Sequence, residues 1–183
     1  MLAARKKNTV PNEPEDHALG RSQGGFTTKI HVKTDRLGHV LGIVLTPGQC
    51  HESTQFEAVM ESGPTPVTPV EIEPMSTTET TRPESATTTG RPKAVAGDKA
   101  SSAQRIRDWC AVNQIEDVIP TRANEPPRGN FDKEKYRQRN IIERAIGWLK
   151  ECRRVLTRFE KYAFHYLAFV QLAIIQRFLN TEL

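Results

Sequence analysis

The sequence has few cysteines, and their spacing suits neither metal binding nor disulfide pairing. The three that occur, Cys50, Cys110 and Cys152, are odd in number and far apart, and no CxxC pair is found. The pattern therefore indicates neither a zinc site nor a disulfide framework. We expect reduced thiols in a cytosolic protein.

Long apolar runs are also lacking. Residues 1–10 contain no apolar stretch of the kind that a secretory signal needs. The most apolar run, residues 162–179, is interrupted by His165, Gln171 and Arg177. This is typical of a core helix and not of a membrane span, so we expect no membrane partner.

Acidic residues are outnumbered in the second half of the chain, although the net charge of the whole is only +4. Residues 93–183 carry 17 Lys and Arg against 11 Asp and Glu, whereas residues 47–92 carry two against seven. The central segment thus masks a basic C-terminal half. A clustered basic surface suits a phosphate backbone, which supplies most non-specific affinity for DNA. Charge alone is also compatible with an ordinary soluble surface.

Composition divides the chain, which is long enough for one domain with a core, into four segments. Residues 1–25 are basic, then rich in Pro, Glu and Gly, and predict an irregular segment. Residues 26–61 predict a β-hairpin and a short helix. Residues 62–92 are rich in Thr, Pro, Ser and Glu, and predict a disordered insertion because they cannot bury enough apolar surface to offset their ordering entropy. Residues 93–183 form the remainder of the domain.

The hairpin is predicted from alternation. Apolar and polar residues alternate from Phe26 to Val32, a Gly-containing turn follows at residues 35–39, and residues 40–46 form a second apolar strand. Thr54 and Glu57 have the spacing of a capping box and predict the start of the short helix.

Beyond the insertion the pattern predicts a β–α–β unit. Residues 94–98 form a brief apolar strand, a helix runs from Ser101 to about Asn113, and a further strand covers residues 117–120. Ser101 and Gln104 again have capping-box spacing. This order implies a parallel strand pair with a right-handed crossover. A final apolar helix is expected from about Tyr162.

The most informative stretch is residues 131–154. Tyr136, Arg139, Glu143 and Lys150 lie at offsets of three, seven and fourteen from the tyrosine. On one continuous helix their directions fall within about 60° of each other. The alternative is a solvated helix face, on which Arg139 and Glu143 form an ordinary i,i+4 pair contributing a few tenths of a kcal/mol.

Three blocks of the sequence resemble one family. The spacing Tyr-x2-Arg-x3-Glu-x6-Lys, together with the stretch RNIIERAIGWLKECRRVLTRFEK, is similar to the third catalytic block of bacterial insertion-sequence transposases of the DDE class, families four and five. AVAGDKASSAQRIRDWC resembles their second block, a strand that ends in an aspartate. GRSQGGFTTKIHVKTDRLGHVLGIVLTPGQCHES resembles the hairpin before it. The resemblance covers roughly residues 17–60 and 92–180.

The resemblance implies an α/β fold, a ribonuclease H-like mixed sheet with flanking helices. It also implies metal-dependent cleavage and transfer of DNA strands at insertion-sequence ends, with two Mg²⁺ or Mn²⁺ ions in the complete enzyme. The expected partners are terminal inverted repeats and target DNA, with a homo-oligomer as the active complex. We expect this complex in the bacterial cytoplasm, associated with the nucleoid.

Two carboxylates carry the expected chemistry. Asp98 ends a strand where ligands bind in α/β sheets, and Glu143 would reach the same metal ions from its helix. Taken alone, Asp98 is equally suited to capping a loop or helix.

The same resemblance implies further site residues. Arg139 and Lys150 would contact DNA phosphate, and Tyr136 would stack on a base, although packing alone explains an aromatic residue there as well. Further candidates are His51, for which a structural role is the alternative, and Lys99 and Arg21.

One block of the family is missing. Its first aspartate lies on a strand that precedes the glycine-rich loop, and residues 1–19 contain no match: Asp16 lies in a Pro/Glu-rich turn, and Asp35 lies at the hairpin tip. The usual N-terminal DNA-recognition helices are absent too, and residues 62–92 replace a short connection. We therefore expect an incomplete fold without its first, central strand.

The chain is accordingly interpreted as the downstream part of a transposase, inactive alone: either a second reading frame or a decayed copy. The alternative is a non-catalytic DNA-binding or regulatory fragment that competes with the full-length transposase. A metal-dependent nuclease with no role in transposition is a third interpretation, because this kind of fold is compatible with several phosphodiester reactions.

Overall fold

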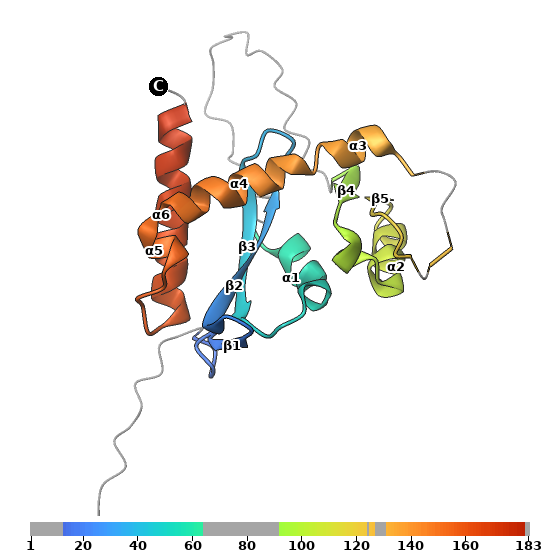
Figure 1. Ribbon diagram of the computed structural model, residues 1–183. Coiled ribbons are helices and arrows are strands. Elements are labelled where there is room, and N and C mark those ends of the chain that lie inside the picture. Colours follow the sequence, from blue (N-terminus) through green and yellow to red (C-terminus); the bar gives the residue numbers. More distant parts are fainter. Residues whose placement is uncertain (1–12, 64–91, 124, 127–130, 182–183) are drawn as a thin grey trace, which may run out of the picture.

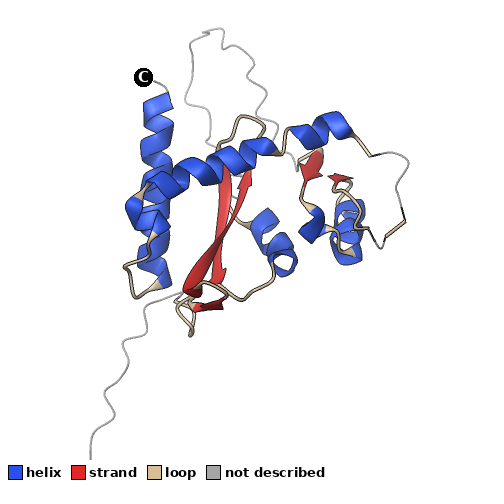
Figure 2. Ribbon diagram, viewed as in Figure 1, coloured by secondary structure: helices blue, strands red, loops and turns tan. Residues whose placement is uncertain are grey.

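The structure is a computed structural model that describes residues 13–63, 92–123, 125–126 and 131–181 (Figure 1). The predicted insertion at residues 62–92 lies almost entirely outside the described residues. The described chain is α/β, with helices flanking two small sheets (Figure 2). None of its described helices has the length and apolar character needed to cross a lipid bilayer.

The first sheet contains the predicted hairpin. Its strands, in the order β1-β2-β3 and antiparallel throughout, are β1 (Gly20–Ser22), β2 (Gly25–Thr34) and β3 (Val40–Pro47). β2 and β3 pair from Thr28 opposite Pro47 to Thr34 opposite Val40. The turn between them is held by Asp35, which accepts hydrogen bonds from the backbone N–H groups of Leu37 and His39 at 2.8 and 2.9 Å.

The second sheet is the predicted parallel pair. β4 (Ala94–Ala96) pairs with β5 (Glu116–Val118), and the connection contains a 3-10 turn, η2 (Lys99–Ser101), and helix α2 (Gln104–Val112). Ile106 and Cys110 of α2 are buried against Ile115 and Ile119. Burial raises the pKa of Cys110 to about 11, so this thiol behaves as a small apolar side chain.

Both predicted capping boxes are wrong. α2 begins after Ala103, which provides no side-chain cap, because Ser101 is closed into the 3-10 turn by Asp98. Thr54 lies inside another 3-10 turn, η1 (Glu52–Gln55), and its hydroxyl donates to the carbonyl of His51. The short helix that follows is α1 (Phe56–Glu61).

Four helices remain: α3 (Lys133–Arg137), α4 (Asn140–Glu151), α5 (Arg153–Leu156) and α6 (Ala163–Thr181), the last beginning one residue later than expected. The last three pack on the hairpin. Leu149 of α4, Val155 of α5 and Val170 of α6 form a buried cluster. Ile30, Ile43 and Leu45 of the hairpin pack against it, so these three helices cover one face of the sheet.

A different contact joins the hairpin to the second sheet. α1 lies between the two sheets in Figure 1, and its Phe56 ring meets the Trp109 ring of α2 edge to face, with 5.6 Å between centroids. Arg105 of α2 donates to Glu57 and to the carbonyl of Ser53, both at 2.7 Å. The molecule therefore has two apolar clusters, connected mainly through α1 and α2.

The N-terminal part of the chain is more ordered than predicted. Residues 20–22 form β1, within the segment expected to be irregular. Upstream, the carboxylate of Glu13 accepts hydrogen bonds from the N–H groups of Ala163 and Phe164, at 2.7 and 3.0 Å. It thereby caps α6 from 150 residues away and ties residues 13–18 to the C-terminal helix.

Glu13 should contribute measurably to stability. Burial by itself raises the pKa of this carboxyl, but the hydrogen bonds from Phe164, Ala163 and His17 together hold its pKa below the ordinary value. Replacing Glu13 with Gln removes the charge and one of the two acceptor oxygens. We expect the free energy of unfolding at pH 7 to fall by about 1–2 kcal/mol in urea denaturation.

The effect should depend on pH. Because the pKa is lower in the folded chain, the stabilisation is present above the unfolded pKa, about 4.3, and is lost as the pH falls through the folded value. The stabilities of the wild type and Glu13→Gln should therefore converge as the pH falls below the folded pKa of Glu13. Glu15→Gln, at an exposed position, should change stability by less than about 0.5 kcal/mol. Equal losses in the two variants would contradict the capping role.

Candidate functional site

The predicted signature helix is two helices. α3 ends at Arg137, α4 begins at Asn140, and 3-10-type hydrogen bonds connect them, such as Arg139 N–H to Tyr136 C=O at 3.0 Å. The physical reason is that the two helices have different anchors. Lys135 of α3 forms a 2.6 Å ion pair with Glu116 at the start of β5, whereas α4 packs on the hairpin. The chain bends between these anchors without leaving a helical path.

Three of the four signature residues are in contact. The Arg139 guanidinium lies over the Tyr136 ring, 5.7 Å from its centroid, and also forms an ion pair with Glu143. Lys150 lies about two turns further along, in the last turn of α4. The expected stripe is therefore present despite the break.

This stripe faces away from the core. Ala145 and Leu149 are the buried residues of α4, and Glu143 and Lys150 are exposed on the opposite side. Lys150 and the neighbouring Arg144 form no ion pair with another described residue. Residues 131–161 carry ten Lys and Arg against five Asp and Glu. The helices α3 to α5 thus present an accessible, positively charged surface.

Asp98 lies where the sequence predicted it, after the carboxyl end of β4. Its carboxylate accepts from the N–H and the hydroxyl of Ser101, at 3.1 and 3.2 Å, so in this structure it caps η2. α3, in contrast, is tied to the amino end of β5 through Glu116. Asp98 and the helix leading to Glu143 are thus anchored at different ends of the small parallel sheet.

The described residues alone do not form a metal site. They contain no group of three or more His, Cys, Asp and Glu side chains arranged to hold an ion. Asp98 and Glu143 as a metal-binding pair therefore stay a prediction from the sequence. A hard divalent cation would need further oxygen ligands beyond these two carboxylates.

The other candidate residues either bond to nearby backbone or lie exposed to solvent. The Nδ1 atom of His51 accepts from the N–H of Ser53 at 3.3 Å, so the ring caps η1, which is the structural role weighed above. Lys99 is exposed at the start of η2, and Arg21 is exposed on β1. Lys29, on the polar face of β2, donates to the carbonyl of Cys50 at 2.8 Å.

Comparison with known proteins identifies the family. The sequence model of the family described as "Transposase DDE domain" matches residues 8–176. This chain belongs to the DDE transposase family. It is similar to a putative transposase for insertion sequence element IS402 from Burkholderia cepacia, with 29% identity over 167 residues. The match covers 91% of this chain and 66% of that protein, so the chain spans just under two thirds of the relative's length. No solved structure matches the chain.

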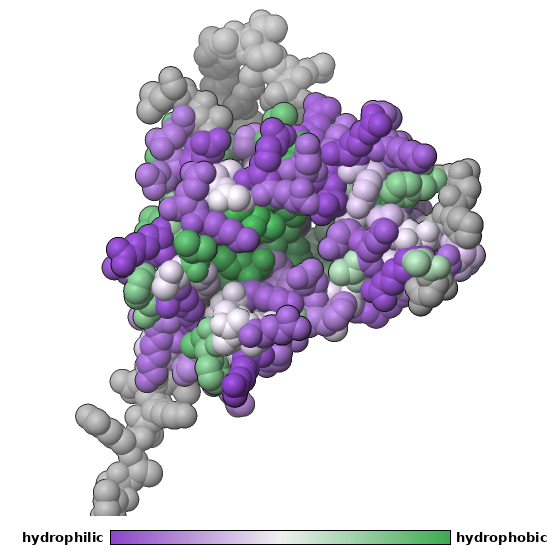
Figure 3. Space-filling view, in the orientation of Figure 1, coloured by the Kyte–Doolittle hydropathy of each residue, from purple (hydrophilic) through white to green (hydrophobic). Residues whose placement is uncertain are grey.

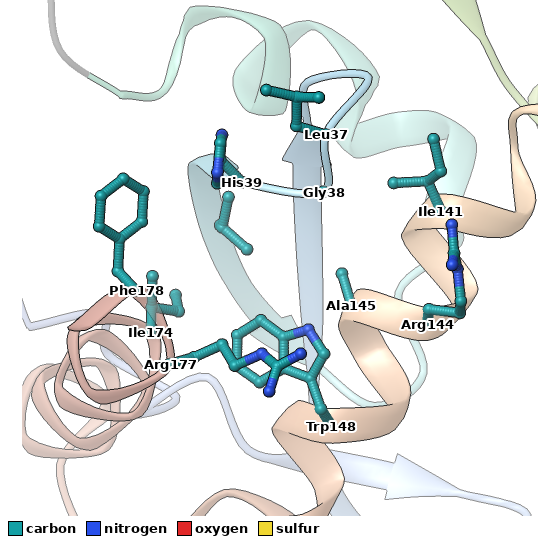
Figure 4. Close-up of a pocket in the computed structure, with 11 residues that line it drawn as sticks. Leu37, Gly38, His39, Ile141, Arg144, Ala145, Trp148, Ile174, Arg177 and Phe178 are labelled. Atoms are coloured by element: carbon teal, nitrogen blue, oxygen red, sulfur yellow. The ribbon is translucent and has the colours of Figure 1, made fainter. Parts of the chain in front are cut away.

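A hollow lies beside α4, the second of the two signature helices. It has a volume of about 340 Å³ and opens between the hairpin turn, α4 and α6. In Figure 4 the side chains of Arg144, Trp148 and Arg177 border it from the two helices. Its lining contains Arg144 and Arg177 and no carboxylate. The positive surface of α4 therefore continues around the helix into the hollow.

Sequence reasoning missed a buried ionic network next to Asp98. Arg107 is only 6% exposed, forms a 2.7 Å ion pair with Asp117 and donates to Ser102 at 3.2 Å. Ser102 in turn donates to Glu125, and this hydrogen bond lowers the pKa of the Glu125 carboxyl. The network holds the turn that bears Asp98 against the segment after β5. An arginine between apolar positions on the inner face of the predicted helix was the only signal for it.

Arg107 should therefore contribute far more to stability than its exposed neighbour. Arg107→Gln leaves two carboxylates without their cation, and we expect a loss of about 3 kcal/mol in urea unfolding. Arg105→Gln is the matched control, because Arg105 lies on the same helix and is half exposed in its pair with Glu57. It should cost less than about 1 kcal/mol. Similar losses in the two variants would contradict a buried structural role for Arg107.

Proposed function

We propose that this chain is the downstream part of a DDE transposase catalytic domain that cleaves and transfers DNA strands at insertion-sequence ends, and that it is inactive alone. One observation carries the proposal. The hairpin sheet and the parallel sheet each present an unpaired strand edge, and together they would accept one further strand.

The first edge belongs to β2. β1 covers only its beginning, with Gly20 opposite Thr27 and Ser22 opposite Gly25. Among the described residues, the part of β2 from Thr28 to Thr34 pairs with β3 alone. A long strand with an unpaired edge exposes N–H and C=O groups that a sheet normally satisfies on both sides.

The second edge belongs to β4, which pairs with β5 and with no other described strand. In Figure 1 α1 lies between the hairpin and β4. In Figure 3 an apolar area lies over the hairpin below α4, and the surface is hollowed next to it. A strand inserted between the edges would pair with β2 and β4, cover apolar surface and join the two sheets into one.

A single mixed sheet of this kind is the ribonuclease H-like arrangement that the sequence resembles. The added strand would carry the family's first aspartate. Its carboxylate would be a third ligand beside those of Asp98 and Glu143. With that strand in place, the residues would offer the oxygen ligands that Mg²⁺ or Mn²⁺ prefers. The incomplete ligand set is the reason to expect no catalysis by the chain alone.

The exposed stripe on α4 supports DNA as the partner. Arg139 offers a planar fork and Lys150 a point charge for phosphate oxygens. Arg144 adds a cation that forms no ion pair with another described residue. Such contacts position a duplex without reading its sequence. The proposed DNA is the terminal inverted repeats and a target site, held by an oligomeric complex in the bacterial cytoplasm.

A second function is favoured by the same incompleteness. Without the additional strand the chain retains the basic surface of α3 to α5 and so keeps a way to bind DNA. It would then act as a non-catalytic fragment that competes with full-length transposase for DNA ends or for subunits.

Activity should require the missing strand. The 183-residue chain with Mg²⁺ should not cleave a substrate carrying terminal inverted repeats. A fusion that adds the first-aspartate strand and the DNA-recognition helices of a full-length relative should cleave it. The matched control is the same fusion with that aspartate changed to Asn. Cleavage by the unfused chain would overturn the proposal, whereas salt-dependent binding without cleavage by the active-sequence fusion would favour the competitor fragment.

Glu143→Gln tests the assignment of the helix carboxylate. In the active fusion we expect this variant to lower strand cleavage by at least about 1,000-fold, because the amide keeps the shape but not the charge that a cation requires. DNA binding measured by fluorescence anisotropy should change by less than about threefold. Glu151→Gln, exposed at the end of the same helix, is the control and should cleave normally. Unchanged cleavage by Glu143→Gln would remove the residue from the site.

A further inference from the structure

The C-terminal helix is apolar on two opposite sides. One side, with Ala163, Tyr166, Val170 and Ala173, is buried against the rest of the domain. α6 lies at the outer margin of the molecule, at the left of Figure 1. An apolar helix side is normally packed against another surface, so the outer side of α6 calls for a covering surface.

Large apolar side chains lie exposed on that outer side. Phe164 is 52% exposed, Leu172 58%, Ile175 54% and Leu179 60%. With Ala168 they recur at intervals of four, four, three and four residues. At about 100° per residue their directions fall within about 80°, opposite the buried set. This is the spacing of a helix–helix seam, and no charged residue interrupts it.

We infer that this stripe is a dimerisation surface, on which α6 pairs with α6 of a second copy in antiparallel orientation. The stripe is symmetric about Leu172. A two-fold axis there places Phe164 against Leu179 of the partner subunit and Ala168 against Ile175 of the partner subunit. Ile175 then faces a small residue, Phe164 and Leu179 face each other, and Leu172 lies at the centre.

The chemistry of the stripe favours a second copy as the occupant. The stripe has no charge that would select an acidic or basic partner, and Arg177, the only Lys, Arg, Asp or Glu within Ala163–Thr181, lies on the other side of the helix. Pairing the helix with itself therefore brings no like charges together. A self-complementary patch also closes after two copies instead of forming a chain.

The area fits a reversible dimer. The four large side chains together expose on the order of 400 Å² of apolar surface, a size at which exposed patches are often functional. Two such helices with their flanking residues would bury on the order of 1,000 Å², at the lower end of specific interfaces. The inference does not rest on the proposed DNA chemistry.

Sedimentation equilibrium of the 183-residue chain tests the inference. We expect a concentration-dependent dimer, and Leu172→Glu should raise its dissociation constant at least about 100-fold because two carboxylates would face each other in an apolar seam. Val112→Glu, at an 83% exposed apolar position at the end of α2, should leave dimerisation unchanged.

Cross-linking tests the orientation, with the partly buried Cys50 and Cys152 changed to Ser. Mild oxidation of a mixture of Phe164→Cys and Leu179→Cys chains should join one of each, and neither variant should cross-link with itself. Self-linking of Phe164→Cys would overturn the antiparallel pairing. A monomer at all concentrations, or association that Leu172→Glu leaves intact, as expected for pairing through the β2 or β4 edges, would overturn the dimerisation surface itself.

Discussion

Backbone hydrogen bonding between strands is the constraint on which the rest of this structure depends. A strand inside a sheet needs two neighbours, and β2 and β4 have one described neighbour along most of their length. The two sheets are consequently held together by side chains, chiefly Phe56 on Trp109 and Arg105 on Glu57. The described fold therefore consists of two separately packed parts.

The position of the signature residues follows from this division. α4 is fixed to the hairpin through Leu149, while α3 is fixed to the parallel sheet through Lys135. The chain between them carries Arg139, which contacts both Tyr136 and Glu143. Any change in the distance between the sheets would act first on this junction. A strand that joined the sheets would thus also set the relative positions of Asp98 and Glu143.

The family model accounts for the likeness of the three sequence blocks, and the structure accounts for what they share physically. The hairpin supplies an apolar face, Asp98 follows the first strand of the β–α–β unit, and the late helix presents a charged stripe to solvent. Membership of the DDE transposase family explains why these three features occur in one chain. The exposed outer side of α6 is a further feature, which neither the family signature nor the basic surface requires.

Local patterns predicted much of the fold. Alternation predicted β2 and β3, and the β–α–β order predicted the parallel pair of β4 and β5. The errors came where two local signals competed. Ser101 has capping-box spacing with Gln104, but the Asp98 carboxylate closes the chain into a 3-10 turn first. β1 was missed because three residues are too few to show alternation.

Contacts between distant residues were beyond sequence reasoning. Glu13 caps a helix 150 residues away. Arg107 forms an ion pair with Asp117 and donates to Ser102, which in turn donates to Glu125. Nothing in the spacing of these residues indicates that they meet, because only the packing of the elements brings them together.

The sequence by itself determined most of the strands and helices, the charged stripe and the family, because these depend on residues within a few turns or one strand of each other. The tertiary structure decided where the signature helix breaks, which side of α4 faces solvent and which strand edges have no partner among the described residues. Those features depend on anchors in different elements, and their geometry is set by burial and hydrogen bonding across the whole domain.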